Sequence, residues 1–203
     1  MNMEHIRDPW GHVPHLRGEH VTLEALRPEH ADGLRGALAE GRLWELWYTS
    51  VPEPDAVEAY IAGALDAQAR GECLVFVVRD AAGDIVGTSR YYQLDRRVPR
   101  LAIGYTWYAT KVQRTGLNTQ AKLLLLEHAF ETLACEAVVF ETSWFNHASR
   151  TAIARLGAKQ DGVLRNHMRH RDGTLRDTVV FSITAGEWPT VKRHLQGKLQ
   201  QHG

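Results

Sequence analysis

The chain has 203 residues, with 24 Lys and Arg side chains against 24 Asp and Glu, so its formal charge is zero. This balance argues against a uniformly basic nucleic-acid-binding protein. The charge is nevertheless uneven, because residues 1–90 carry 8 basic and 15 acidic side chains, whereas residues 91–203 carry 16 basic and 9 acidic ones. The positive C-terminal half is therefore the part that we expect to meet an anionic ligand.

The composition predicts neither a membrane segment nor a disulfide framework. Hydrophobic residues make up 44% of the chain and charged residues 24%, which is ordinary for a soluble globular protein. No apolar run approaches the ~20 residues that a membrane span needs, and the charged first residues lack the apolar core of a secretory signal. We therefore predict a cytoplasmic protein in which Cys73 and Cys135, both inside apolar stretches, are buried reduced thiols.

The chain is predicted to begin with an irregular arm, a strand and two helices. The strand alternates apolar with polar side chains, and the first helix carries apolar residues at helical spacing behind a proline in its opening turn. These elements are the arm at residues 1–20, the strand at 21–26, and the helices at 28–39 and 56–69, the second capped by Asp55. Between the helices, Trp44, Trp47 and Tyr48 either pack in the core or line a ligand pocket.

The rest of the pattern predicts a mixed α/β domain. Three short apolar strands separated by turns indicate an antiparallel meander, and a helix with a broad apolar face then leads to a buried strand. That strand–helix–strand crossover implies one parallel pair in the middle of the sheet. Because no repeat or linker divides residues 21–203, we predict a single domain. The expected strands lie at residues 74–78, 85–92, 101–108 and 137–142, the helices at 118–133, 146–156 and 188–199, and a hairpin at 163–170 and 178–183.

The loop between the strand at 101–108 and the following helix has features of an anion site. The unpaired amides of a first helical turn, together with the positive end of the helix dipole, can hold a phosphate group. Gly116 would let the backbone approach that group closely, and Arg114 and Lys111 would add charge. Asn118 could cap the helix or adopt a left-handed conformation. For Gly116 alone, an ordinary strand-to-helix turn is the alternative interpretation.

A second motif follows at a fixed distance from this loop. The Gln-x-x-Gly of the loop is succeeded by a buried strand and then by Asn146-His-Ala-Ser149 at the start of a helix that ends in Leu-Gly-Ala. Together with IGYTW before the loop, QRTGLNTQAK in it and LRDTVVFSI near the end, this order resembles the GNAT N-acetyltransferase superfamily, and within it the RimJ/RimL-like branch. The resemblance covers residues 21 to about 183. It implies a central mixed β-sheet, flanked by helices, whose two parallel strands splay apart.

The resemblance also implies acetyl-CoA as co-substrate, with no metal. Pantetheine would lie between the splayed strands, its pyrophosphate would sit on the loop, and Asn146 would hydrogen-bond the pantetheine arm. Backbone groups of Tyr105, Thr106 and Trp107 would pair with pantetheine and polarise the thioester carbonyl. The residues that the resemblance assigns to the co-substrate are Tyr105, Thr106, Trp107, Gln113, Arg114, Thr115, Gly116, Leu117, Asn118, Thr119, Asn146 and Ser149.

The reaction implied is direct attack of a neutral primary amine on the thioester in a ternary complex. The amine must lose a proton and the departing thiolate must gain one. The sequence departs from the family pattern in two places, because Ala102 stands where many relatives have a glutamate and Ile153 where many have the tyrosine acid. In the RimL-like branch a serine takes the acid role, and this serine matches Ser149.

The identity of the base stays open at this level. The carboxylate base of the branch falls near Met168, which cannot accept a proton, so the neighbouring His167 and the strand residue Glu141 are the candidates. A surface histidine in a hairpin is the alternative interpretation of His167. The hairpin arginines are either a solvated group or a site for a ligand carboxylate or phosphate; they are Arg165, Arg169, Arg171 and Arg176.

Two classes of function remain open from the sequence. In the first, the protein acetylates a protein N-terminal α-amine or a small amine. In the second, motivated by the missing glutamate and tyrosine, it senses acyl-CoA without catalysis. Binding of nucleic acid through the basic half is the least favoured interpretation, no membrane partner is expected, and a homodimer is compatible with the sequence.

Overall fold

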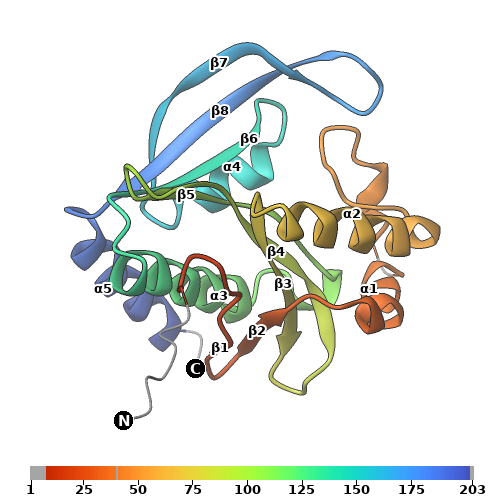
Figure 1. Ribbon diagram of the computed structural model, residues 1–203, viewed down its shortest axis with the longest axis horizontal. Coiled ribbons are helices and arrows are strands. Elements are labelled where there is room, and N and C mark those ends of the chain that lie inside the picture. The colour runs from red at the N-terminus through yellow and green to blue at the C-terminus, as the bar shows by residue number, and fades with distance from the viewer. Residues whose placement is uncertain (1–7, 40, 202–203) are drawn as a thin grey trace.

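The computed structural model describes residues 8–39 and 41–201, which form an eight-stranded mixed sheet flanked by helices (Figure 1). The strands lie in the order β1-β2-β3-β4-β5-β6-β8-β7. The predicted meander and terminal hairpin are therefore confirmed. The strands are β1 (Leu16–Arg17), β2 (Val21–Ala25), β3 (Cys73–Asp80), β4 (Ile85–Asp95), β5 (Arg100–Tyr108), β6 (Ala137–Ser143), β7 (Lys159–Arg169) and β8 (Leu175–Thr184), and the α-helices are α1 (Ala31–Leu38), α2 (Val57–Ala69), α3 (Gly116–Glu127), α4 (His147–Ala154) and α5 (Trp188–Gln200).

The one parallel contact in the described sheet is the predicted pair, β5 with β6. Every other neighbouring pair of strands is antiparallel. The chain crosses from β5 to β6 through α3, because parallel neighbours need a long connection. The mixed sheet and its central crossover thus agree with the expected architecture.

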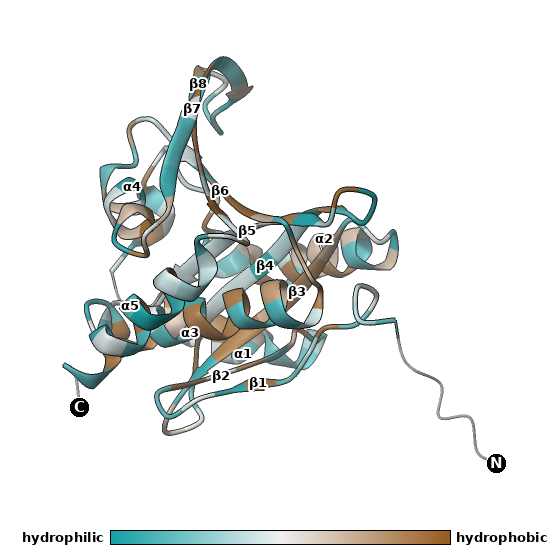
Figure 2. Cartoon of the chain, turned by 90° about the vertical axis from the view of Figure 1, so that its left-hand side faces the viewer, coloured by the Kyte–Doolittle hydropathy of each residue, from teal (hydrophilic) through white to brown (hydrophobic). Residues whose placement is uncertain are grey.

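Helices cover both faces of the sheet. Two residues of β4 that point to opposite faces show which helix lies on each face. Thr88 bonds the hydroxyl of Tyr60 in α2 at 3.0 Å, whereas Tyr91 donates to the carbonyl of Leu125 in α3 at 2.6 Å. Successive strand residues point to opposite faces, so α2 and α3 lie on opposite sides. The buried strand β3 is drawn mainly in brown and the exposed strand β7 mainly in teal in Figure 2.

Both cysteines are buried and free, as predicted. Burial raises the pKa of each thiol, that of Cys135 to about 12. A thiol with a raised pKa is a poor nucleophile at neutral pH. The cysteines therefore contribute to the core, and the chemistry of the protein must come from other residues.

Several predicted element boundaries were wrong. The arm contains a short strand, because Leu16 and Arg17 pair with β2; residues 1–7 of that arm lie outside the described residues. Each of the two early helices is preceded by a 3-10 turn whose first residue is a proline, Pro28–His30 before α1 and Pro54–Ala56 before α2. Asp55 lies inside the second turn, so Ala56 takes the N-cap position without a side-chain bond.

The long central helix is shorter than predicted as a regular α-helix. It begins at Gly116, and from His128 to Thr132 its path continues as a wider π-helical turn. The apolar face expected for this helix is nevertheless present, since Leu123, Leu126 and Ala129 are buried. None of the helices in the described ranges is long and apolar enough to cross a bilayer.

Candidate active site

The centre of the sheet opens into a fork between β5 and β6. Residues Arg100–Ala102 of β5 pair with Ala137–Val139 of β6, and the pairing ends there. Beyond it, β5 continues to Tyr108 and β6 to Ser143. The edge of β5 that faces β6 therefore has unpaired backbone groups beyond Ala102, which can bond an extended ligand. Because α3 follows β5 and α4 follows β6, both helices begin at the open end of the fork. The fork consists of residues 103–108 of β5 and 140–143 of β6.

A bulge in β5 lies inside the fork. Thr88 pairs with Trp107 and Arg90 with Gly104, so β5 has one more residue than β4 over this interval. Tyr105 takes up the difference with a left-handed backbone, φ +50°, and its carbonyl accepts a hydrogen bond from the Thr88 hydroxyl at 3.2 Å. Bulges redirect backbone groups away from the ladder. The residues predicted to meet the thioester, 105–107, are those at and beside this bulge.

A buried lysine on α3 lies directly beneath the bulge. Lys122 donates to the hydroxyl of Thr106 at 2.7 Å and to that of Ser89 at 3.4 Å, and these two hydroxyls bond each other at 2.8 Å. Burial lowers the pKa of Lys122 to about 7. Lys122 is not among the residues predicted from the motifs, although a lysine in the apolar stripe with Leu125 and Ala129 is a local signal for a buried polar site.

The loop before α3 is held together by its own side chains. Thr115 caps the helix: its hydroxyl accepts from the amide of Leu117 at 3.3 Å and donates to the carbonyl of Val112 at 2.8 Å. Gln113 donates its side-chain amide to the carbonyl of Tyr108 at 3.0 Å. The left-handed residue is Arg114, with φ +63°. The expectation that Asn118 would cap the helix or adopt this conformation was therefore wrong, because the helix begins two residues before it.

Lys111 and Gly116 of this loop both have partners inside the protein. Lys111 forms an ion pair with Asp84 at 3.1 Å, so its charge is already partly neutralised. A side chain at Gly116 would meet the ring of His20, 3.3 Å from the added carbon, so packing inside the protein also favours a small residue at this position. Arg114 is exposed and makes no ion pair within the described chain. Arg114 is thus the basic side chain left available to an anion at the start of α3.

The second helix of the fork begins as the sequence predicted. Asn146 caps α4, its side-chain oxygen accepting from the amide of Ser149 at 3.0 Å. The side-chain NH₂ group of Asn146 bonds nothing in the described chain, so it remains available to a ligand. Ser149 lies in the first turn of α4 and is partly exposed. Asn146 and Ser149 therefore meet at the α4 end of the fork.

Glu141 lies on β6 two residues beyond the last parallel pair, Ala102 with Val139. Alternation along β6 places its side chain on the face that carries Val139 and Ala102. On the same face, the hydroxyl of Tyr92 donates to the Glu141 carboxylate at 3.4 Å, and the Tyr92 ring lies over Gly104, where an added carbon would approach it to 2.8 Å. Glu141 thus supplies a carboxylate beside Ala102, the position where many relatives have a glutamate.

The other candidate base, His167, is not brought to this place. It is exposed in the outer part of β7, where the register with β8 is interrupted between Leu164 and Met168. No hydrogen bond or ion pair links it to Glu141 or Ser149 in the described residues. The structure therefore places Glu141 in the fork and His167 on the projecting hairpin.

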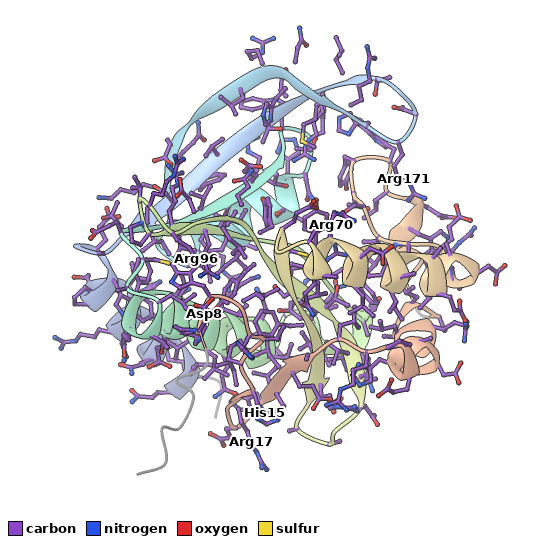
Figure 3. All side chains as sticks on the ribbon, in the orientation of Figure 1. Asp8, His15, Arg17, Arg70, Arg96 and Arg171 are labelled. Atoms are coloured by element: carbon purple, nitrogen blue, oxygen red, sulfur yellow. The ribbon has the colours of Figure 1, made fainter. Side chains whose placement is uncertain are left out.

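The tip of the β7–β8 hairpin bends down to the segment between α1 and α2, where Arg171 is labelled in Figure 3. Arg171 donates to the carbonyls of Trp44 at 3.3 Å and Val51 at 3.1 Å. The Trp47 ring contacts those of His170 at 4.6 Å and Phe145 at 5.4 Å between centroids. The aromatic segment is thus divided, because Trp44 packs against the core whereas Trp47 is 44% exposed beside the hairpin.

The described residues contain no group of three or more His, Cys, Asp or Glu side chains arranged to hold a metal ion. The groups gathered at the fork are instead backbone amides, two helix N-termini, hydroxyls, an amide and one carboxylate. Such groups are suited to positioning an extended anionic ligand and moving a proton.

A mixed sheet whose one parallel pair opens toward two helix N-termini is the arrangement expected from the resemblance to an acetyl-group transferase, and comparison with known proteins identifies this class. The sequence profile of the acetyltransferase (GNAT) domain matches residues 20–159. The chain belongs to the GNAT acetyltransferase family. The uncharacterized N-acetyltransferase YoaA of Bacillus subtilis (strain 168) is 30% identical over 103 residues, which cover 49% of this chain and 55% of YoaA. That match spans only about half of the relative.

Solved structures share the fold over most of the chain. A GCN5-related N-acetyltransferase from Brucella melitensis superposes with a TM-score of 0.83 at 28% identity, covering 92% of this chain and 85% of the other. Mycobacterium smegmatis RimJ, in complex with CoA-disulfide, superposes with a TM-score of 0.75 at 21% identity over 94% and 96% of the two chains. The GNAT-like architecture expected from the sequence is confirmed.

Proposed function

We propose that this protein transfers the acetyl group of acetyl-CoA to a primary amine, by direct attack within a ternary complex. The observation that carries the proposal is the fork, in which the unpaired edge of β5 and the first turns of α3 and α4 converge on a bulge beside Glu141. An extended pantetheine arm fits such an edge as an added strand. The acceptor is a protein N-terminal α-amine or a small amine.

The residues of the fork fit the parts of acetyl-CoA. The pyrophosphate would meet the first-turn amides of α3, and Arg114 would contact it from the preceding loop. The NH₂ group of Asn146 and the backbone of residues 105–107 would bond the pantetheine arm and the thioester carbonyl. Gly116, Asn118 and Thr119 of the predicted set lie in this first turn. Gln113, Thr115 and Leu117 act by shaping the loop, since their side chains bond or pack within the protein.

When bound, acetyl-CoA supplies an activated acyl group on sulfur. Glu141 accepts a proton from the acceptor ammonium, so that the neutral nitrogen can bond to the acetyl carbon. The nitrogen releases its second proton to solvent as the carbon–sulfur bond breaks, and the Ser149 hydroxyl supplies a proton to the departing sulfur. Glu141 passes the proton that it accepted to solvent before the next turnover. The products are an N-acetyl amide and CoA with a free thiol, and Ser149 regains its proton from solvent.

Time-dependent release of CoA thiol from acetyl-CoA, in the presence of a panel of primary amines, tests the proposal. Mass spectrometry of the amines in the same reactions identifies the acetylated product. We expect stoichiometric formation of thiol and N-acetyl amine. Tight binding of acetyl-CoA without thiol release for any amine or peptide would instead favour the acyl-CoA sensor.

Ser149→Ala is expected to lower kcat more than it weakens acetyl-CoA binding. The change removes the hydroxyl but leaves the Ser149 amide that Asn146 caps, so α4 keeps its N-terminus. A general acid contributes typically 10²–10⁴-fold, and we expect a loss at the lower end of about 10²-fold, because a thiolate is a good leaving group. Steady-state kinetics and calorimetric titration measure the two effects, and an unchanged kcat would place the acid elsewhere.

Arg114→Gly is expected to weaken acetyl-CoA binding by about tenfold, the scale of one charged hydrogen bond. Glycine accepts the left-handed backbone of this position without strain, so the substitution isolates the loss of the guanidinium. Lys111→Ala serves as the matched control, since Lys111 is paired with Asp84, and its effect should be small. Calorimetry at two salt concentrations tests this, and equal losses for both variants would contradict the assignment.

A further inference from the structure

Two arginines beside the fork form no ion pair with any of the residues that the structure describes. Arg90 on β4 is only 8% exposed, and Arg176 on β8 is half-buried. The Nε atom of each is enclosed by the protein and makes no hydrogen bond. A buried cation without a partner is costly, so these side chains have the character of a site that a ligand completes.

Aromatic rings hold Arg90 in place. Its guanidinium lies 4.5 Å from the ring centroid of Tyr105 and 4.9 Å from that of Tyr60 on α2. The Tyr105 ring meets the Tyr92 ring edge to face at 5.3 Å, and Tyr105 itself is 44% exposed. Arg90 is therefore immobilised by stacking next to a surface that a ligand can reach.

Arg176 lies on β8 four residues before Val180, which pairs with Glu141, so alternation along the strand places Arg176 and Glu141 on the same face of the sheet. Burial lowers the pKa of its guanidinium, while the nearby Tyr92, Glu141 and Tyr105 act electrostatically in the opposite direction. We call Arg90, Tyr92, Tyr105, Glu141 and Arg176 the polar cluster. It contains two guanidinium groups and one carboxylate, so one positive charge is uncompensated.

The polar cluster lies on the face of the sheet away from the expected phosphate site. Arg90 contacts Tyr60 of α2, whereas its neighbour Ser89 bonds Lys122 of α3 on the opposite face. The first turn of α3 is the part of the fork suited to phosphate. The uncompensated charge of the polar cluster is consequently directed at something other than the phosphates of the donor.

We propose that Arg90 and Arg176 bind a carboxylate of the acceptor, so that the substrate class is a primary amine bearing a carboxylate near its nitrogen. This inference rests on the proposed acetyl transfer at Glu141. The planar guanidinium fork matches the two oxygens of a carboxylate. A carboxylate anchored there holds the adjacent amine beside Glu141. Arg176 lies on β8, beyond residues 20–159, which match the family profile.

A comparison of matched acceptors tests the inference. The acceptors are the L-amino acids with their carboxamides, and the peptides Asp-Ala-Ala-NH₂ and Glu-Ala-Ala-NH₂ with their Asn and Gln counterparts. The first series represents a main-chain carboxylate and the second a side-chain carboxylate. We expect kcat/KM to favour the carboxylate member of at least one pair by about tenfold or more. The series that shows the preference identifies whether the site binds a main-chain or a side-chain carboxylate.

Variants connect such a preference to the two arginines. Arg176→Gln and Arg90→Lys should each bring the carboxylate-to-amide ratio close to one while leaving the Kd of acetyl-CoA unchanged. Arg169→Gln, on the same hairpin but exposed and bonded to the carbonyl of Gly173, should keep the ratio of the wild type. Circular dichroism checks folding of the buried Arg90 variant, and Arg176→Gln alone suffices if that variant unfolds.

The outcomes separate this inference from the proposed function. Thiol release with equal kcat/KM for the two members of every pair overturns the carboxylate site and leaves acetyl transfer standing, as does a preference that survives in Arg176→Gln. If no amine gives thiol release, the proposed acetyl transfer is wrong. The carboxylate site is then tested independently, by calorimetric titration of the same acid and amide pairs into protein saturated with CoA. There, equal Kd values for acid and amide overturn it, and tighter binding of the acid that Arg176→Gln abolishes supports it.

Discussion

Glu141→Gln is expected to lower kcat by about 10²–10⁴-fold, the contribution typical of a positioned general base. Glutamine keeps the shape of the side chain and can still bond Tyr92, which donates to Glu141 at 3.4 Å, so the fork should stay intact. Because the amide cannot accept the proton of the ammonium, the reaction then depends on the small fraction of acceptor that is already neutral. The acetyl-CoA affinity should remain close to that of the wild type, and kcat of the variant should rise steeply with pH.

His167→Gln is the matched control for this prediction. His167 is exposed on β7 and contacts neither Glu141 nor Ser149, so its loss should change kcat by less than about twofold. Steady-state rates of thiol release for both variants, from pH 6 to pH 9, provide the comparison. A large loss with His167→Gln and none with Glu141→Gln would assign the base to the hairpin, and would require that hairpin to move toward the fork.

Lys122→Met is expected to make the protein more stable and less active. Burial lowers the pKa of Lys122 to about 7, from an ordinary value near 10.5. Between these values the unfolded chain holds a proton that the folded chain does not, so the free energy of unfolding of the wild type rises with pH by about 1.4 kcal/mol per unit. The methionine variant lacks this contribution. Its stability advantage is therefore largest below about pH 7 and declines toward pH 10.

Urea unfolding of both proteins at pH 6.5, 8 and 9.5 measures this difference. Lys198→Met, a change at a partly exposed lysine of α5, corrects for the removal of one positive charge. Turnover should fall in Lys122→Met because the bulge loses the amine that bonds Thr106 at 2.7 Å. A stability difference that is independent of pH would contradict the lowered pKa, and a normal kcat would show that Thr106 and Ser89 hold the bulge without the lysine.

Local patterns were sufficient to predict the elements that depend on neighbours in sequence. The cap at Asn146 was predicted correctly because it depends on residues within one helical turn. The central crossover was also correct, since a strand, a long helix and a strand leave few arrangements. Other helix starts were predicted wrongly, namely the 3-10 turns that begin at Pro28 and Pro54 and the cap at Thr115. At these positions the local sequence allows more than one starting residue, and tertiary packing selects among them.

The composition of the fork could not be predicted, because it depends on strand register. A one-residue bulge at Tyr105 reverses which side chains of β5 share a face with those of β4. Arg90 and Tyr92 meet Tyr105 only through that shift, and Glu141 joins them only because the parallel strands separate after Ala102. Lys122 had a local signal, but its partners Ser89 and Thr106 are far away in sequence.

Because β5 and β6 pair over a short segment, a bound donor would contribute to the stability of the sheet. Strands β1–β5 and β6–β8 form two half-sheets whose strand pairing is limited to Arg100–Ala102 with Ala137–Val139. In the proposed binding mode a pantetheine arm in the fork would add bonds across this seam and its departure would remove them, so cohesion between the half-sheets would rise and fall once per turnover. Amide hydrogen exchange along residues 140–143 would then slow as the fork is occupied, and the Tm of the protein would rise with the concentration of acetyl-CoA.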